Sequence, residues 1–194
     1  MPDPNALTRE FFARSAVEVA PDLLGVELRV GPCSVVLTEV EAYVEADPAS
    51  HSYRGQTPRN AAMFGPPGRA YVYLCYGIHW CINVVTGPPG SGEAVLIRAG
   101  VVTRGEALVR QRRPKVTNHV SLTNGPGKLT AALGIDRSYD GTDLLLRRSP
   151  ARLVSSGASD PVSWLATPRI GISVGRDRPW RFVASDASFV SRGR

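Results

Sequence analysis

Two glutamates in the stretch LTEVEAYV are the first residues whose types and spacing could do chemistry. Glu39 and Glu41 lie two positions apart, so a β-strand would place both carboxylates on one face. Val35 and Leu37 would share that face. If it borders a core or a cleft, burial raises the pKa of at least one glutamate and makes it a good general base. If it meets solvent, the pair has no such role, and the pattern alone leaves both interpretations open.

Three of the six tyrosines cluster in AYVYLCYGIHWCINVV, residues 70–85. Tyr71 and Tyr73 would share a strand face, and Tyr76-Gly77 would form the tip of a hairpin, where glycine supplies a positive φ. A tyrosine at such a tip has few neighbours to bury its ring. It either folds back onto the protein surface or serves as a wedge that enters stacked bases through the minor groove.

The strand that returns from this tip alternates between two kinds of side chain. One face would be apolar and the other would carry hydrogen-bonding groups: Ile78, Trp80 and Ile82 against His79, Cys81 and Asn83. Asn83 between buried strand neighbours needs hydrogen-bond partners for its amide, and either the backbone or a ligand can supply them.

Several other functional patterns are excluded. NGPGK at 124–128 is not a Walker A motif, because Leu122 and Leu129 stand where glycine and Ser or Thr are required, so the chain is not a P-loop nucleoside triphosphatase. The helix start at Gly127 and Lys128 could still hold a single phosphate. The histidines and cysteines lack the spacing of metal ligands, and no GxSxG motif is present. We expect no metal and no cofactor.

The composition is that of a water-soluble globular domain. The 194 residues carry a net charge of +6, and all but two of the 23 basic residues are arginines, which fits either an anionic partner or a coding bias. No apolar run approaches the ~18–20 residues of a membrane span, and MPDPNALTREFF lacks the features of a signal peptide. A cytoplasmic protein with three reduced cysteines, packed as small apolar residues, is expected.

The first half of the chain predicts two short helical pieces and two hairpins. Thr8 and Ser15 are possible N-caps, Pro21 should interrupt the helix, and Gly25 should end it. A hairpin over 26–44 and the one over 70–85 should flank a long ordered loop, at 46–69.

The second half predicts a strand and two helices before a strand pair. The expected order is a strand at 93–99, a helix capped by Thr103 that ends in RQRRP, a helix from Pro126 to Gly134, a loop at 149–168, and a strand–turn–strand at 169–185. Because strands outnumber helices and most are joined by tight turns, we expect an α+β domain with antiparallel pairing.

A long segment carries a family resemblance. TEVEAYVEADPASHSYRGQTPRNAAMFGPPGRAYVYLCYGIHWCINVV, followed by EAVLIRA, resembles the alkyladenine (3-methyladenine) DNA glycosylase family, and NGPGKLTAALGI and RIGISV extend the match to roughly 20–185. The resemblance implies one domain over 1–194, with a curved antiparallel sheet, flanking helices and a protruding hairpin; 1–7 and 187–194 are expected to be flexible.

The resemblance also implies a role for each matching residue. Glu41 would activate the attacking water, and Arg98 would help to hold the flipped nucleotide and that water. Tyr76 would fill the gap left in the duplex. The residues that would form the base pocket are Tyr43, His51, Tyr73 and Asn83. The candidates for DNA-backbone contacts are Arg54, Arg59, Gly127 and Lys128.

The implied activity is excision of damaged purines in base-excision repair. Such an enzyme flips the nucleotide out of double-stranded DNA, hydrolyses the N-glycosidic bond and leaves an abasic site without cutting the strand. The implied substrates are 3-methyladenine and 7-methylguanine, with hypoxanthine and ethenoadenine left open. We expect a monomer without an obligate protein partner, associated with the nucleoid if the source is bacterial. Two alternatives are a non-catalytic nucleic-acid-binding module and a hydrolase of free nucleosides.

Overall fold

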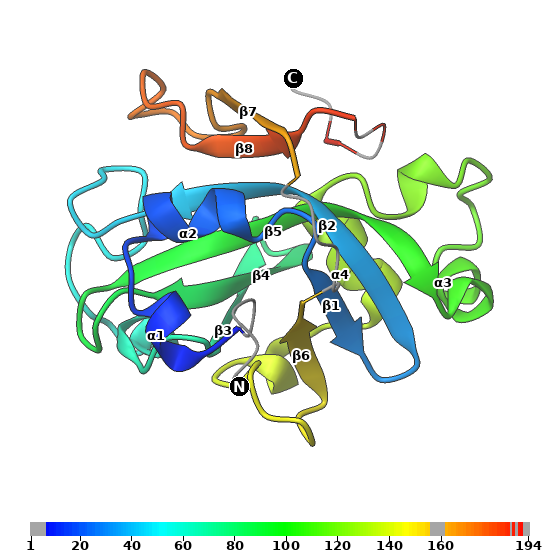
Figure 1. The fold of residues 1–194 in the computed structure, drawn as a ribbon, viewed down its shortest axis with the longest axis horizontal. Coiled ribbons are helices and arrows are strands. Elements are labelled where there is room, and N and C mark those ends of the chain that lie inside the picture. The colour runs from blue at the N-terminus through cyan, green and yellow to red at the C-terminus, as the bar shows by residue number, and fades with distance from the viewer. Residues whose placement is uncertain (1–6, 156–161, 187, 189, 192–194) are drawn as a thin grey trace.

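A curled antiparallel sheet with short helices around it forms the protein, as the computed structural model shows (Figure 1). The structure describes residues 7–155, 162–186, 188, 190 and 191. Within them the sheet has eight strands: β1 (Glu27–Val30), β2 (Cys33–Tyr43), β3 (Ala70–Cys75), β4 (His79–Thr86), β5 (Glu93–Arg104), β6 (Ala151–Val154), β7 (Trp164–Thr167) and β8 (Arg181–Ala184). The helices are α1 (Arg9–Phe12), α2 (Ala16–Asp22), α3 (Glu106–Arg112) and α4 (Pro126–Leu133), with 3-10 turns η1 (Ala61–Phe64), η2 (Val120–Leu122) and η3 (Arg137–Tyr139). The predicted α+β class and curved sheet are confirmed.

Strand β2 organises the sheet because it has different partners on its two edges. One edge pairs with β5 along most of its length. The other edge pairs first with β1 and then, from Glu39 onward, with β8. The sheet therefore forks at the middle of β2, and Figure 1 shows β7 and β8 lying apart from β1 and β6.

A bulge at the fork corrects one expectation about β2. The pairing steps from Leu37 opposite Gly100 to Glu39 opposite Ala99, which leaves Thr38 as the extra residue. Gly100 permits the strands to approach closely there, since a Cβ on it would lie 2.6 Å from the Val36 carbonyl oxygen.

The bulge turns the two glutamates away from the main core. Val35 and Leu37 share this core with Val40 and Ala42 beyond the bulge. The prediction that the glutamates share the face of Val35 and Leu37 is therefore wrong, because the extra residue reverses the alternation of side chains.

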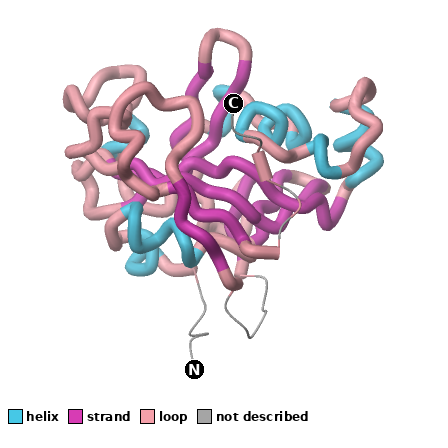
Figure 2. The backbone as a smooth tube through the Cα atoms, turned by 90° about the horizontal axis from the view of Figure 1, so that it is seen from above, coloured by secondary structure: helices cyan, strands magenta, loops and turns pink. Residues whose placement is uncertain are grey.

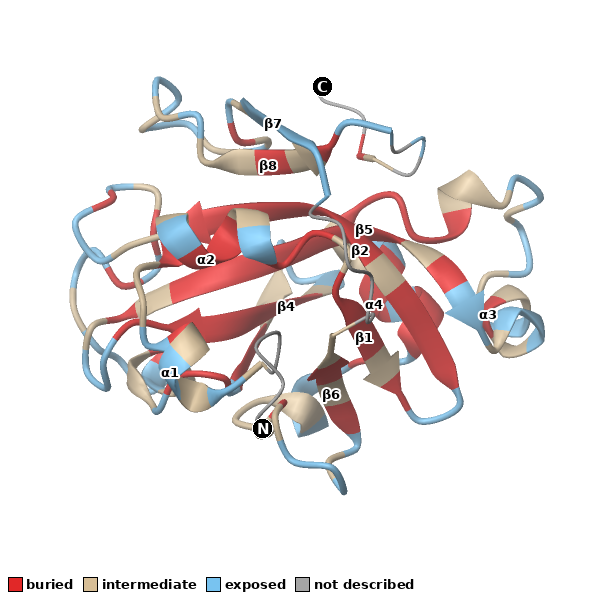
Figure 3. Cartoon of the chain, in the orientation of Figure 1, coloured by how far each residue is buried: buried red, intermediate tan, exposed pale blue. Residues whose placement is uncertain are grey.

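The main hydrophobic core lies between the sheet and helices α2 and α4, and a smaller cluster lies under η1. The central strands β2, β4 and β5 are buried along most of their length (Figure 3). The smaller cluster joins Met63, Tyr71, Val85 and Ala94, with Tyr43 and Tyr73 packed against it. This aromatic cluster is separate from the aliphatic core.

The two predicted N-terminal helices are present, but the break between them is not at Pro21. Thr8 caps α1 by accepting a hydrogen bond from the Phe11 backbone at 3.2 Å. The first helix ends at Phe12, with Ala13 as its C-cap, and Pro21 lies inside α2. Local and distant carboxylates both hold the start of α2: Glu18 accepts from the Ser15 backbone at 3.2 Å, and Glu93 accepts from the Ser15 hydroxyl and the Ala16 backbone, at 3.0 and 2.8 Å.

Strand β5 is longer than predicted, and this displaces the cap of α3. The strand continues to Arg104 because its pairing with β2 extends to Ser34. Thr103 is therefore part of the strand rather than a helix cap, and Gly105 takes the N-cap position with φ +73°. The helix from Pro126 to a stop at Gly134 is confirmed.

The C-terminal part of the chain was predicted least well. The expected loop at 149–168 contains strands β6 and β7, on either side of residues 156–161, which lie outside the described part. The expected strand–turn–strand at 169–185 holds a single strand, β8, and its partners are β7 and β2. Four-residue strands carry little local sequence signal, so pairing with neighbouring strands decides whether they form.

The hairpin and loop predicted in the first half are confirmed. The hairpin of β3 and β4 stands out from the body of the protein (Figure 2), with Gly77 at φ +72° in its turn. Residues 46–69 contain η1 and otherwise no regular element. Among the described residues, no helix has the length and apolar character needed to cross a membrane. The predicted flexibility of 1–7 and 187–194 concerns residues that lie mostly outside the described part.

Substituting Gly105 tests the turn between β5 and α3. A Cβ there would lie 2.8 Å from the Cys33 sulfur and 2.9 Å from the Pro32 carbonyl, on a backbone at positive φ. Gly31→Ala is the matched control, with φ +54° and open space around the new methyl. We expect Gly105→Ala to lower the free energy of unfolding by about 2–4 kcal/mol and Gly31→Ala by about 1 kcal/mol in urea titrations. If both variants lost the same free energy of unfolding, the contacts of the new Cβ at position 105 would add no cost.

Candidate functional site

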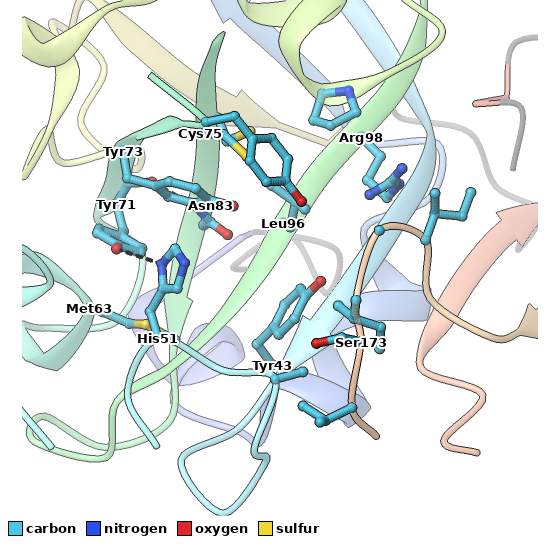
Figure 4. Close-up of a pocket in the computed structure, with 18 of the residues that line it drawn as sticks. Tyr43, His51, Met63, Tyr71, Tyr73, Cys75, Asn83, Leu96, Arg98 and Ser173 are labelled. Carbon is cyan, nitrogen blue, oxygen red and sulfur yellow. Dashed lines mark hydrogen bonds between the residues drawn. The ribbon is translucent and has the colours of Figure 1, made fainter. Parts of the chain in front are cut away.

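A cavity of about 580 Å³ opens beside the β3–β4 hairpin (Figure 4). Tyr43 and residues 170–174 line one side, and His51, Tyr71 and Tyr73 line the opposite side. The other lining residues are Pro48, Ala49, Arg59, Met63, Cys75, Tyr76, Cys81, Asn83, Leu96, Arg98 and Pro126. Its volume is in the roughly 300–1,000 Å³ range of small-ligand pockets.

Glu41 is completely buried directly behind the cavity wall. Its side chain accepts hydrogen bonds from the Tyr43 hydroxyl at 2.9 Å, Arg98 Nη1 at 3.0 Å and the Ile170 backbone N–H at 2.8 Å. All three donors belong to residues that line the cavity, while Glu41 itself does not. The solvent-exposed interpretation of this carboxylate is therefore wrong.

Arg98 joins Glu41 to the second glutamate of the motif. Its Nε donates to Glu39 at 2.8 Å, so the guanidinium lies between two buried carboxylates. Burial alone would lower the pKa of Arg98, but Glu41 and Glu39 outweigh it and raise the pKa. The three residues therefore form an alternating row of charges on β2 and β5.

Glu39 accepts hydrogen bonds from three residues that are distant from it in the sequence, and no sequence pattern predicted them. Arg181 on β8 donates to it at 2.7 Å, and both the backbone and the hydroxyl of Ser191 donate as well. Burial alone would raise the pKa of Glu39, but Arg98, Arg181 and Ser191 outweigh burial and lower it. Glu39 is therefore not the glutamate whose pKa burial was expected to raise.

Tyr43 is fixed from behind by an ion pair that the sequence analysis missed. The Arg169 guanidinium lies 4.6 Å from the Tyr43 ring centroid, and the Arg169 side chain is bonded to that of Asp47, both without exposure to solvent. Burial and then the charge of Glu41 raise the pKa of the Tyr43 hydroxyl far above its usual value. The same tyrosine lines the cavity.

The opposite wall is a cluster of three rings. Tyr71 and Tyr73 are stacked with centroids 5.4 Å apart, and His51 meets the edge of Tyr73 at 4.5 Å. His51 Nδ1 lies 2.9 Å from the Tyr71 hydroxyl, the dashed contact in Figure 4. Partial burial, and secondarily the charge of Arg59, lower the pKa of His51, so the imidazole is neutral at pH 7. Burial raises the pKa of Tyr71 to about 12, and it also raises the pKa of Tyr73 well above its usual value.

Asn83 lies in the same wall and is bonded to the backbone. Its side-chain nitrogen donates to the Tyr71 carbonyl at 2.9 Å, which fixes the orientation of the amide. Backbone pairing was one of the two predicted ways to satisfy this residue. Asn83 also lines the cavity, where a ligand would meet it.

Tyr76 occupies the tip of the hairpin with 82% of its surface exposed, at φ +51°. Ile78 beside it is 71% exposed. The alternative in which Tyr76 folds back onto the protein is therefore wrong. The exposed ring also borders the mouth of the cavity.

The four candidates for backbone contacts lie in different surroundings. Arg59 lines the cavity and donates to the Leu74 carbonyl at 3.2 Å. Gly127 packs against His79 of the hairpin, where a Cβ would lie 2.8 Å from the histidine. Lys128 Nζ donates to Asn124 Oδ1 at 2.9 Å, and Arg54 is exposed in the loop at 46–69.

No metal-binding cluster of three or more His, Cys, Asp or Glu residues occurs in the described part of the chain. The cysteines are free thiols, with Cys33 and Cys81 buried and Cys75 half-buried. The pocket residues that the sequence analysis missed include Tyr71, Met63 and residues 170–174. Tyr71 could have been found, because it shares a strand face with Tyr73.

The fold and this cavity define an α+β protein with a buried acid behind an aromatic pocket and an exposed aromatic hairpin tip. The sequence model of the methylpurine-DNA glycosylase family matches residues 10–188. A protein of Rhodopseudomonas palustris (strain BisB18), named "Putative 3-methyladenine DNA glycosylase", is 53% identical over 96% of this chain and 90% of its own length.

Two further relatives carry the same name. The protein of Burkholderia cenocepacia (strain HI2424) is 48% identical over 94% of this chain and 89% of its own length. That of Streptomyces avermitilis is 48% identical over 98% of this chain and 92% of its own length. The chain therefore belongs to the methylpurine-DNA glycosylase family of DNA-repair enzymes, as the resemblance indicated.

Acid should destabilise the protein through Glu39. The pKa of Glu39 in the folded protein lies below its usual value of 4.5, so its ionised form contributes stability above pH 4.5 that is lost as the pH falls through the lowered pKa. We expect the melting temperature, followed by circular dichroism from about pH 6 to about pH 3, to fall less steeply in Glu39→Gln than in the wild type. Equal slopes would show that the Glu39 pKa is not lowered by folding.

Proposed function

We propose that this protein is a monofunctional DNA glycosylase that hydrolyses the N-glycosidic bond of alkylated purines in double-stranded DNA. The observation that carries the proposal is the fully buried carboxylate of Glu41, held by three residues that line an aromatic cavity beside an exposed tyrosine. The family membership supports the class of reaction. The substrates would be 3-methyladenine and 7-methylguanine.

Tyr76 is placed to hold a damaged nucleotide outside the helix. A base within a duplex cannot reach the cavity, so its nucleotide must rotate out, at a cost of a few kcal/mol for unstacking and unpairing. The exposed Tyr76 ring would fill the space that the base leaves, and it borders the cavity that would receive the base. A weakened pair around a damaged base rotates out more readily, which contributes to selectivity.

The extruded purine would stack between Tyr43 and the opposite wall of Tyr73 and His51. A cationic alkylpurine between aromatic faces gains roughly 0.5–2 kcal/mol, which a neutral base does not. Asn83, whose amide is fixed by the Tyr71 carbonyl, would disfavour an unmodified guanine by crowding its exocyclic amine. Hypoxanthine and ethenoadenine are neutral, so their release would additionally need a proton donor.

Glu41 would act as the general base on a water that attacks C1′ of the sugar. The water gives a proton to the carboxylate as its oxygen bonds to C1′, and the bonding electrons leave with the base. The carboxylate also stabilises the positive charge that develops on the sugar. The Tyr43 hydroxyl occupies one oxygen of Glu41, so the water must share or displace that hydrogen bond.

The chain offers little for a strand-cutting reaction. A lyase step needs an amine that forms a Schiff base with the sugar. The two lysines are Lys115 and Lys128, and neither lines the cavity. Lys128 and Gly127 at the start of α4 would hold a phosphate, and Arg54 and Arg59 would contact the backbone on the loop side. We propose that the enzyme works as a monomer and leaves an abasic site.

Glu41→Gln tests the proposed base. Glutamine keeps the shape of the side chain but cannot accept the proton of the water, so we expect lesion DNA to bind as before and base release to fall by about 10²-fold or more. A duplex with a single 3-methyladenine analogue or 7-methylguanine is incubated with protein and heated in alkali, and cleavage at the abasic site is measured. Full excision by the variant would remove Glu41 from this role. Binding without cleavage by the wild type would favour the non-catalytic module.

Tyr76→Ala tests the wedge. Removing the ring should weaken binding to lesion duplex by roughly ten-fold or more, because stacking against bases is worth about 1–3 kcal/mol. Leu165→Ala, which truncates another exposed apolar side chain on β7, is the control and should bind normally. Affinities are compared by fluorescence anisotropy on lesion and undamaged duplexes. A Tyr76→Ala protein that binds lesion duplex as tightly as the wild type would contradict the proposal.

A further inference from the structure

Ser191, near the end of the chain, has no part in the function proposed above, yet it bonds directly to the charge row behind the cavity. Its hydroxyl donates to Glu39 Oε1 at 2.5 Å and accepts from Arg98 Nη2 at 3.1 Å. Its backbone N–H donates to Glu39 Oε2 at 2.5 Å, and its carbonyl accepts from Arg181 at 3.4 Å. The residue is 8% exposed.

These contacts complete the hydrogen bonding of the Arg98 guanidinium. The three nitrogens of its guanidinium have three different partners, with Nε on Glu39, Nη1 on Glu41 and Nη2 on Ser191. Because the guanidinium is planar and rigid, fixing Nε and Nη2 also fixes the direction in which Nη1 points. That nitrogen is one of the three donors that hold Glu41.

The hydroxyl of Ser191 suits this place for a chemical reason. A hydroxyl can donate to a carboxylate and accept from a guanidinium at the same time. No apolar side chain can do either, and its presence would leave one N–H of Arg98 without a partner in a buried place and would remove one of the three donors to Glu39 Oε1. The Ser191 hydroxyl is thus matched to both charges.

We propose that Ser191, acting with Glu39, is a positioning residue that orients Arg98 and through it the Glu41 carboxylate. This inference rests on the proposed function of Glu41. Neither Ser191 nor Glu39 lines the cavity, so neither would touch the substrate. Ser191 follows β8 in the sequence, so the pairing of β8 with β2 would bring Ser191 to the site.

A purely structural role for Ser191 predicts a different result. In that case its loss lowers the melting temperature and leaves the rate of base release unchanged in protein that is still folded. A positioning role predicts that the rate of the chemical step falls while the affinity for lesion DNA does not, because binding uses the cavity and the hairpin.

The experiment compares Ser191→Ala, Ser191→Thr and Glu39→Gln with the wild type, on a duplex with a single 7-methylguanine. Ser185→Ala, which changes an exposed serine after β8, is the matched control. Base release is measured in single turnover with protein in excess, lesion affinity by anisotropy, and folding by thermal melts, with assays run well below each melting temperature.

We expect the rate of base release to fall about ten-fold or more in Ser191→Ala and Glu39→Gln, with affinity within about two-fold of the wild type. Ser191→Thr keeps the hydroxyl and should restore most of the rate, and Ser185→Ala should match the wild type. Should Ser191→Ala fail to fold, Glu39→Gln tests the same positioning contacts, and a folded Glu39→Gln protein that releases base at the wild-type rate would contradict the inference.

Two outcomes would overturn the inference. A folded Ser191→Ala protein that releases base at the wild-type rate would show that the contacts are structural only, while the proposed function would stand. A loss of rate in Ser191→Ala that a folded Ser191→Thr protein does not restore would show that the hydroxyl is not what matters. If the wild type and Ser185→Ala released no base, the proposed function itself would fall, and this inference with it.

Discussion

The burial of alternating charges between β2 and β5 is the constraint on which the site depends. A carboxylate such as Glu41 is costly to bury unless opposite charge and hydrogen-bond donors surround it. Arg98 supplies the charge for both glutamates, and its own burial is possible because they flank it. Removing Arg98 would take away the positive charge that the two buried carboxylates share, so their burial depends on this guanidinium. The cavity takes its geometry from this row.

The same logic applies on the other side of Tyr43. The buried ion pair of Asp47 and Arg169 supports the ring from behind, and the Ile170 backbone N–H next to that arginine reaches Glu41. One short segment after β7 therefore holds both the proposed stacking ring and the proposed base. This explains why residues 170–174 are irregular: a strand here would direct its backbone donors to a neighbouring strand rather than to the site.

Local elements of the fold depend on neighbours in the chain, and the rest depends on distant segments. The hairpin with Tyr76-Gly77 at its tip and the helix from Pro126 to Gly134 were predicted correctly, because turn and cap residues act on their own backbone. The face of Glu39 and Glu41 was predicted wrongly, because a bulge at Thr38 reverses the alternation. Strands β6 and β7 were missed, since four residues carry little pattern before their partners are known.

The sequence by itself determined the turns, the strand alternation on either side of the bulge, the aromatic hairpin and, through its long resemblance, the family. Only the tertiary structure decided that Glu41 is buried, that Asp47 meets Arg169 across 122 positions and that Ser191 meets Glu39 across 152. The physical reason is range: backbone preferences act between adjacent residues, whereas the burial and pairing of charges depend on segments that only folding brings together.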